Sequence, residues 1–185
     1  MRDKTNRLDG PTDVYGEPSM APEERRDKTR VRVARTSVGK GVFAMKRILP
    51  CAVIGEITGK LMSEPYYTSD YCFDFEDGRQ LEPVSPFRFV NHSCEPNCTF
   101  ELCDIPHEDG STSRHLYLFA LKEIRPGEEL TIEYNWPANA AIPCRCGEPT
   151  CRGWIVDPVE LDLVIKENGN PLMNTEFQFD FLAEN

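Results

Sequence analysis

The sequence predicts a compact, mainly-β domain that is built from many short strands. Short apolar or alternating stretches recur along the chain, and turns that contain glycine or proline separate them. Only one stretch, near the C-terminus, carries good signals for a helix. The 185 residues suit one domain with extensions and are enough to bury a core.

The expected strands follow one another through the middle of the chain. They cover residues 31–34, 42–45, 52–57, 71–75, 79–82, 99–103, 115–121 and 130–134. Between them we expect a hairpin turn at Gly39–Gly41, a hairpin at Asp77-Gly78 and a turn at Pro126-Gly127. The pattern favours a compact, mainly-β domain.

The helix signals begin at Asp157, which is a suitable N-cap residue. Pro158 suits the first helical position, Glu160 would complete a capping box, and Asn168-Gly169 would end the helix. Beyond the helix, phenylalanines at 177, 179 and 181 alternate with polar residues, as in a half-buried strand.

Both ends of the chain differ from the middle in composition. Residues 1–29 are charged, rich in proline and glycine, and poor in apolar residues, which predicts a mobile extension. Residues 155–185 carry one lysine against seven acidic residues, and the whole chain has a formal charge of −10. This balance argues against direct binding to a nucleic acid backbone and is compatible with a basic peptide partner.

The sequence also predicts where the protein works. No apolar run approaches the ~20 residues needed to cross a bilayer, and the first residues lack the apolar part of a secretory signal. We therefore expect an intracellular protein with no membrane contact, nuclear in a eukaryote and otherwise cytoplasmic.

Eight cysteines allow two readings, four disulfides or a metal site. The spacing of Cys144, Cys146 and Cys151 presents three thiolates to one soft cation, and the other cysteines are irregularly spaced. With an intracellular location, metal is the better hypothesis. Zinc takes four N or S ligands, so a fourth ligand must come from elsewhere in the chain.

The chemistry gathers in residues 88–98, which hold one of three histidines, two asparagines and two cysteines. Pro96 keeps the stretch between Cys94 and Cys98 out of a helix. Apolar neighbours such as Phe87 and Phe89 can anchor this loop in a core, which makes it a candidate binding loop.

Four motifs together resemble a known family. They are Gly-Lys-Gly-Val-Phe at 39–43, Arg-Phe-Val-Asn-His-Ser-Cys-Glu-Pro-Asn at 88–97, Gly-Glu-Glu-Leu-Thr-Ile-Glu-Tyr at 127–134, and Cys-x-Cys-x4-Cys-Arg-Gly from 144. Their order and spacing resemble a SET-domain protein lysine methyltransferase with a post-SET zinc segment. The resemblance implies the SET-domain fold, with several small sheets, a C-terminal pseudoknot and a short C-terminal helix. It assigns residues 30–136 to the SET domain, 137–156 to the zinc segment and 157–185 to an acidic extension.

The resemblance implies that S-adenosylmethionine is the methyl donor and S-adenosylhomocysteine the product. It assigns Tyr134 and Tyr71 to catalysis, with Tyr134 as the main catalytic residue. The implied cofactor-binding residues are Gly39, Lys40, Gly41, Tyr71, Arg88, Asn91, His92, Tyr134 and Trp154. Without the resemblance, a lone histidine such as His92 is more often structural.

The resemblance also implies a closed, structural zinc site formed by Cys94, Cys144, Cys146 and Cys151. Cys98 is the rival for the fourth ligand. Phe100 and Ile132 fall where the family sets the number of methyl groups, and neither carries a hydroxyl, which predicts transfer beyond one methyl.

The expected substrate is a basic protein or peptide that carries a lysine, with a histone tail as the default. Two alternatives stay open: a SET-fold module that binds peptide or cofactor without turnover, and a methyltransferase for a non-histone protein. The sequence does not distinguish a monomer from a dimer.

Overall fold

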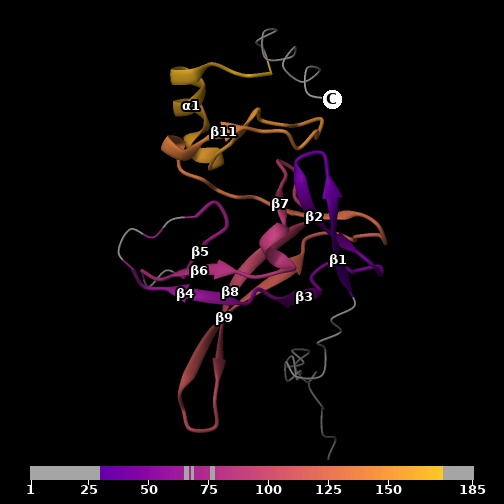
Figure 1. Ribbon diagram of the computed structural model, residues 1–185, viewed down its shortest axis with the longest axis vertical. Coiled ribbons are helices and arrows are strands. Elements are labelled where there is room, and N and C mark those ends of the chain that lie inside the picture. The colour runs from indigo at the N-terminus through magenta and orange to yellow at the C-terminus, as the bar shows by residue number, and fades with distance from the viewer. Residues whose placement is uncertain (1–29, 65–66, 68, 76–77, 173–185) are drawn as a thin grey trace, which may run out of the picture.

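The computed structural model describes residues 30–64, 67, 69–75 and 78–172 (Figure 1). The predicted N-terminal extension and the predicted strand at 177–181 lie outside these residues. Within the described part of the chain, no helix is both long and apolar enough to span a bilayer.

The described residues form short strands and one short α-helix, as the sequence predicts. The elements are β1 (Val31–Thr36), β2 (Gly39–Ala44), β3 (Val53–Glu56), β4 (Gly59–Met62), β5 (Phe73–Asp74), β6 (Gln80–Pro83), β7 (Asn91–His92), β8 (Cys98–Pro106), β9 (Thr112–Ala120), β10 (Glu129–Ile132), β11 (Ile142–Pro143), β12 (Trp154–Ile155) and α1 (Leu161–Asn168).

These strands form four small sheets, which confirms the predicted fold class. Their strand orders are β1-β2-β10-β7, β3-β9-β8, β4-β6-β5 and β11-β12. In the first sheet β7 runs parallel to β10, with Asn91 beside Thr131 and His92 beside Ile132. Residues 91–92 and 131–132 are about forty apart in sequence, yet they lie side by side.

The β1–β2 hairpin differs in detail from the prediction. Thr36 pairs with Gly39, so the turn consists of Ser37 and Val38, and Gly39 to Gly41 already belong to β2. Gly39 has φ +123°, which an L-residue rarely adopts. The Gly-x-Gly motif therefore ends the turn and begins the strand.

Strands β8 and β9 are longer than predicted and form a hairpin that extends away from the sheets (Figure 1). Their register runs without a break from Cys98 opposite Ala120 to Pro106 opposite Thr112. The sequence did not predict the outer half of this hairpin, because its strands are exposed and polar and show no apolar pattern.

The tail helix begins differently from the prediction. Asp157 caps it as expected, since its Oδ1 accepts from the Val159 amide at 3.0 Å, but residues 158–160 form a 3-10 turn before α1. The capping box is wrong, because Glu160 Oε2 accepts from the Ala138 amide at 2.5 Å instead. The helix ends at Gly169 (φ 76°), as expected.

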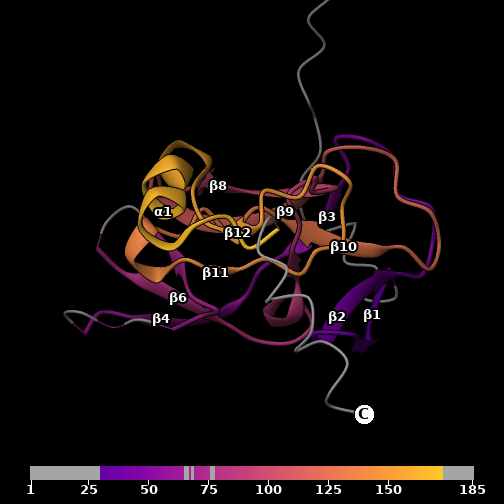
Figure 2. The same cartoon turned by 90° about the horizontal axis from the view of Figure 1, so that it is seen from above.

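Two separate apolar cores hold the described residues together. The main core is formed by sixteen buried residues between Val42 and Ile132. The C-terminal core is formed by Trp154, Val156 and Val164. This second core joins β12, which carries Trp154, to α1, which carries Val164, and Figure 2 shows the two elements near each other.

Candidate active site and metal centre

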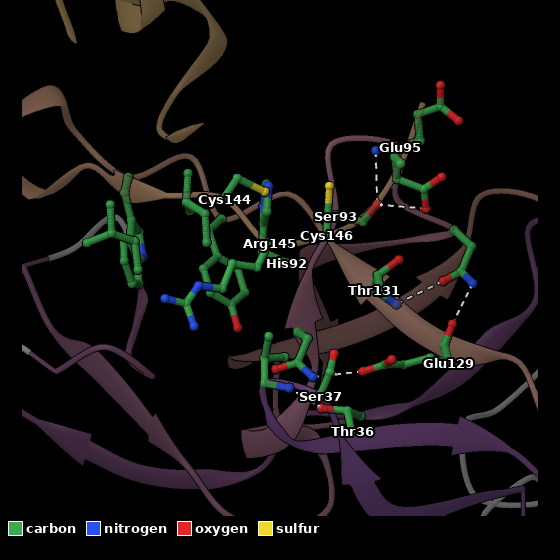
Figure 3. Close-up of a pocket in the computed structure, with 18 of the residues that line it drawn as sticks. Thr36, Ser37, His92, Ser93, Glu95, Glu129, Thr131, Cys144, Arg145 and Cys146 are labelled. Atoms are coloured by element: carbon green, nitrogen blue, oxygen red, sulfur yellow. Dashed lines mark hydrogen bonds between the residues drawn. The ribbon is translucent and has the colours of Figure 1, made fainter. Parts of the chain in front are cut away.

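A cavity of about 940 Å³ lies between the β1–β2 turn, the loop of residues 91–97 and the chain that follows β10 (Figure 3). Carboxylates outnumber basic side chains in its wall: Asp70, Glu95, Glu128, Glu129 and Glu148 against Lys122 and Arg145. Such a wall favours a ligand with positive charge.

A smaller cavity of about 300 Å³ adjoins the first. Its wall includes Gly39 and Lys40 from the start of β2, and Arg88 from the start of the central motif. The two cavities share four wall residues, which are Val38, Tyr71, Asn91 and Tyr134. Two ligands that occupy the two cavities therefore meet beside both predicted catalytic tyrosines.

Asn91 is fixed by two hydrogen bonds from its side-chain amide. Nδ2 donates to the Lys40 carbonyl at 2.9 Å and to Glu129 Oε1 at 2.7 Å. Gly41 makes this possible, because a Cβ there would clash with the Glu129 carboxylate and lie 2.7 Å from Thr36 Cγ2. Gly41 itself lines neither cavity. The glycine therefore leaves room for the Glu129 side chain, not for a ligand.

Hydrogen bonds hold the loop that follows Asn91 against β10. Asn97 Nδ2 donates to the Glu129 carbonyl at 2.7 Å, and the Thr131 amide donates to Asn97 Oδ1 at 2.9 Å. The Ser93 amide donates to the Ile132 carbonyl at 3.0 Å. The side chain of Asn97 thus acts as an additional strand residue, and it keeps the loop rigid at the cavity.

Tyr134 lies at the wall that the two cavities share. Its hydroxyl donates to the Val90 carbonyl at 2.9 Å, which leaves the lone pairs of the oxygen available. Burial, with the nearby Tyr71, Glu129 and Asp70, raises the pKa of Tyr134 to about 12. The phenol therefore stays protonated at neutral pH and is unsuited to act as a base.

Tyr71 is held in place by Arg88 rather than by the core. The Arg88 guanidinium carbon lies 3.9 Å from the centre of the Tyr71 ring, and Arg88 also forms an ion pair with Glu82. Tyr67 donates to the same Glu82 carboxylate at 2.9 Å. Arg88 thus reaches the smaller cavity and also orients Tyr71 there.

A buried charged cluster lies behind the cavity wall. His92 Nδ1 is 3.2 Å from Glu133 Oε1, and Arg152 Nη2 is 2.5 Å from Glu133 Oε2. Burial opposes ionisation of Glu133, but the contacts with His92 and Arg152 outweigh it and lower the pKa of the carboxyl. The cluster joins the central motif to the residue that follows Cys151.

Four thiols gather at the junction of the central loop and the C-terminal segment. The sulfurs of Cys94, Cys144, Cys146 and Cys151 all lie within 4.8 Å of one another. Cys94 Sγ is 3.8 Å from Cys144 Sγ and 4.0 Å from Cys151 Sγ. Tetrahedral zinc with Zn–S bonds of about 2.3 Å places its sulfurs roughly 3.8 Å apart, so the donor set fits zinc.

The surroundings of this thiol group favour Cys94 over the rival ligand Cys98, and a metal site over disulfides. Cys98 is buried in the main core, where its Sγ donates to Asn97 Oδ1, and it is not in the group. All eight cysteines are free thiols. Burial raises the pKa of Cys94 to about 11 in the absence of a metal, and a bound cation would replace the thiol protons.

One predicted cofactor residue lies elsewhere. Trp154 is buried in the C-terminal core, and its Nε1 donates to the Gly169 carbonyl at 3.0 Å. It lines neither cavity, and its large ring packs next to Val156 and Val164, so its role as a cofactor residue stays a prediction. Trp136 lines the larger cavity instead, 5.3 Å from the Tyr134 ring, and its position two residues after Tyr134 was the available signal.

Of the two residues expected to set the number of methyl groups, Ile132 lies in the main core and Phe100 packs against it. Ile132 is buried, and Phe100 packs edge-on against Phe73 at 4.8 Å. Neither lines a cavity. Apart from Gly41, which lies behind the cavity wall, the remaining predicted site residues converge on the two cavities or the thiol group.

Comparison with known proteins agrees with this geometry. The family model of the SET domain matches residues 39–135. The "Histone-lysine N-methyltransferase, H3 lysine-4 specific" of Schizosaccharomyces pombe is 44% identical over 131 residues, which is 62% of this chain and 14% of that protein. "Histone-lysine N-methyltransferase trithorax" of Drosophila virilis is 34% identical over 69% of this chain and 4% of its own length. "Histone-lysine N-methyltransferase 2B" of Homo sapiens is 31% identical over 71% and 5%.

A solved structure is similar over the same region. It is KRYPTONITE in complex with mCHH DNA, an H3(1-15) peptide and SAH, with a TM-score of 0.58 and 26% identity. The similarity covers 68% of this chain and 29% of KRYPTONITE. This chain thus spans only a small part of the relatives it matches. The family match covers more than half of the chain, and the chain belongs to the SET-domain family.

Proposed function

We propose that this SET domain transfers a methyl group from S-adenosylmethionine to a lysine side-chain amine, with a histone H3 tail as substrate. The relatives named above are histone-lysine methyltransferases, and KRYPTONITE binds SAH and an H3 peptide. The observation that carries the proposal is the position of Tyr134, with a protonated hydroxyl at the wall shared by two adjoining cavities.

The cavities suit an in-line displacement. The donor supplies a sulfonium methyl group, whose S–C bond breaks as the lone pair of a neutral amine forms the new N–C bond. Residues at the shared wall align the two reactants, which is the main requirement of such a reaction. The Tyr134 hydroxyl donates its hydrogen to the Val90 carbonyl, so its oxygen can accept a hydrogen bond from the lysine amine. This hydrogen bond orients the amine so that the nitrogen lone pair points at the methyl carbon.

The wall of the larger cavity also suits positively charged ligands. The larger cavity carries an excess of carboxylates, which favours a cationic donor and a basic peptide. Zinc at Cys94, Cys144, Cys146 and Cys151 would hold residues 142–148 in this wall as a structural ion, with no part in methyl transfer. Because the substrate is a histone, the proposed location is nuclear. The absence of direct nucleic acid contact stays a prediction.

Methyl incorporation from labelled S-adenosylmethionine into histone H3 tests the proposal. We expect labelling by the wild-type protein, and a loss of at least ~100-fold in Tyr134→Phe and Asn91→Ala. Tyr117→Phe is the matched control, because Tyr117 lies on β9 and lines neither cavity. Absence of labelling by a folded, zinc-loaded wild type that still binds S-adenosylhomocysteine would favour the binding-module alternative. Labelling of total cell protein but not of histones would favour the non-histone alternative.

We also propose that transfer proceeds beyond one methyl. This rests on the family resemblance, which assigns the number of methyl groups to the positions of Phe100 and Ile132, and neither residue carries a hydroxyl. Mass spectrometry of the product at full conversion tests this. Monomethyl-lysine alone would contradict it.

A further inference from the structure

The β8–β9 hairpin holds two of the three histidines of this chain, and neither lines a cavity of the proposed methyltransferase site. His107 Nε2 lies 2.9 Å from Ser113 Oγ, and His115 Nε2 lies 2.7 Å from the same oxygen. Two imidazole nitrogens therefore converge on one hydroxyl.

The hairpin fixes this convergence. Ser113 and His115 are two residues apart on β9, so their side chains share one face of the sheet. His107 follows the end of β8, and its amide donates to the Ser111 carbonyl at 2.8 Å, which closes the turn. The backbone ladder of β8 and β9 thus brings both rings to the same side.

Glu56 supplies a second, independent observation. Its Oε1 lies 2.8 Å from His115 Nδ1 and comes from β3, the other neighbour of β9. The Nδ1–H of a neutral His115 donates to this carboxylate, which leaves a lone pair on Nε2. A carboxylate at the far nitrogen is the usual support of a metal-binding histidine, because it sets both the tautomer and the ring orientation.

We propose that His107 and His115 bind a late first-row divalent metal ion, such as Cu²⁺, Ni²⁺ or Zn²⁺, through their Nε2 atoms. Imidazole is a preferred ligand of these ions. A metal–imidazole bond is ~2.0–2.1 Å long, so binding requires each Nε2 to turn from Ser113 Oγ toward the ion. His107 then carries its remaining ring proton on Nδ1, since its Nε2 lone pair binds the ion.

The ligand set separates this site from the thiol group. Within the described part of the chain, Cys94, Cys144, Cys146 and Cys151 are the group that brings three or more His, Cys, Asp or Glu ligand atoms together. The hairpin site is not such a group: it offers a metal ion the imidazoles of His107 and His115 and the Ser113 oxygen, and water would complete the coordination. Such a site is open and exchangeable, whereas four thiolates form a closed site.

Nickel titration of the 185-residue protein, already loaded with one zinc per chain, tests the proposal. Paramagnetic Ni²⁺ broadens the NMR signals of nearby protons, and the three histidine rings can be followed separately. We expect the signals of His107 and His115 to broaden at substoichiometric Ni²⁺, while those of the buried His92 stay sharp. Equal broadening of all three rings, or none at one equivalent, would overturn the proposal.

Two substitutions sharpen the test without depending on either histidine. Glu56→Gln removes the carboxylate behind His115 and should weaken Ni²⁺ binding about 10- to 100-fold. Glu101→Gln is the matched control, because Glu101 is an exposed carboxylate of β8. Equal weakening in both variants would show a general charge effect and no built site. His107→Asn should abolish one-equivalent binding, and retained affinity in that variant would also contradict the proposal.

Discussion

The main core and the C-terminal core differ in what holds them together. The main core has sixteen buried apolar residues drawn from three sheets and the loops between them. The C-terminal core has three, and one of them, Trp154, belongs to the two-residue strand β12. So small a core offers little hydrophobic stabilisation, as in mini-proteins that need a metal or disulfide. The C-terminal segment therefore depends on its polar attachments to the SET domain, namely the thiol group and the Arg152–Glu133 pair.

The largest expected effect is that of removing the metal. Structural zinc contributes on the order of 10 kcal/mol in small zinc domains, which exceeds what three buried side chains supply. Chelation, or Cys144→Ser, should open residues 136–172 while β2, β9 and β10 stay protected from hydrogen exchange. Cys98→Ser is the matched control, because Cys98 lies outside the thiol group. An equal loss of hydrogen-exchange protection in both cores would contradict the inference that the metal stabilises mainly the C-terminal core.

Arg152→Gln should have the next largest effect. The side chains of Arg152 and Glu133 are only about a fifth exposed, at 20% and 19%. Removing one partner of a buried ion pair costs up to about 3–5 kcal/mol, and here Glu133 would keep only its contact with His92. We expect this loss in the opening free energy of residues 136–172, measured by hydrogen exchange. A change confined to the main core would show that the pair does not attach the C-terminal segment.

Truncating a side chain in each core compares the two directly. Leu118→Ala in the main core should lower the free energy of global unfolding by about 2–5 kcal/mol. Val164→Ala removes two methyl groups, worth about 0.8 kcal/mol each, and should act mainly on local opening of the C-terminal segment. Urea denaturation reports the first change and hydrogen exchange the second. Equal shifts of the global midpoint would mean that the two cores unfold as one unit.

Local patterns predicted what depends on neighbours in sequence. The short strands, the Asp157 cap and the Gly169 end follow from such patterns, and the thiol spacing indicated three metal ligands. The family resemblance supplied Cys94, because the spacing alone left Cys98 as a rival. What failed depends on tertiary partners. Glu160 matches a capping box, yet the Ala138 amide competes for its carboxylate.

Aromatic residues near the site show the same limit. Trp154 and Trp136 are both next to motif residues, and composition does not tell which faces the cavity. Packing decides, since Trp154 joins Val156 and Val164 while Trp136 lies against Tyr134. Likewise, the His107–Ser113–His115 arrangement depends on the register of a hairpin whose outer half has no apolar pattern.

The smallest expected effect is that of the exposed ion pair between Arg114 and Asp104. Their side chains are 37% and 52% exposed, and Arg114 Nε donates to Asp104 Oδ1 at 2.8 Å. This hydrogen bond lowers the pKa of Asp104 below its ordinary value. Because the folded-state pKa is lowered, the contribution of the pair is present above the ordinary aspartate pKa of about 3.9. It is lost as the pH falls through the lowered value.

Water and salt screen this exposed pair, so Arg114→Gln should leave the urea midpoint unchanged at neutral pH. An NMR titration of Asp104 in the variant should show its pKa rising back toward about 3.9. Arg→Gln thus removes the guanidinium partner of a carboxylate at both positions, Arg152 and Arg114. The two pairs differ in burial, and this difference explains the difference in the expected loss of stability. A midpoint shift at Arg114 as large as the effect at Arg152 would refute that reasoning, since it would give equal weight to a screened pair and a desolvated one.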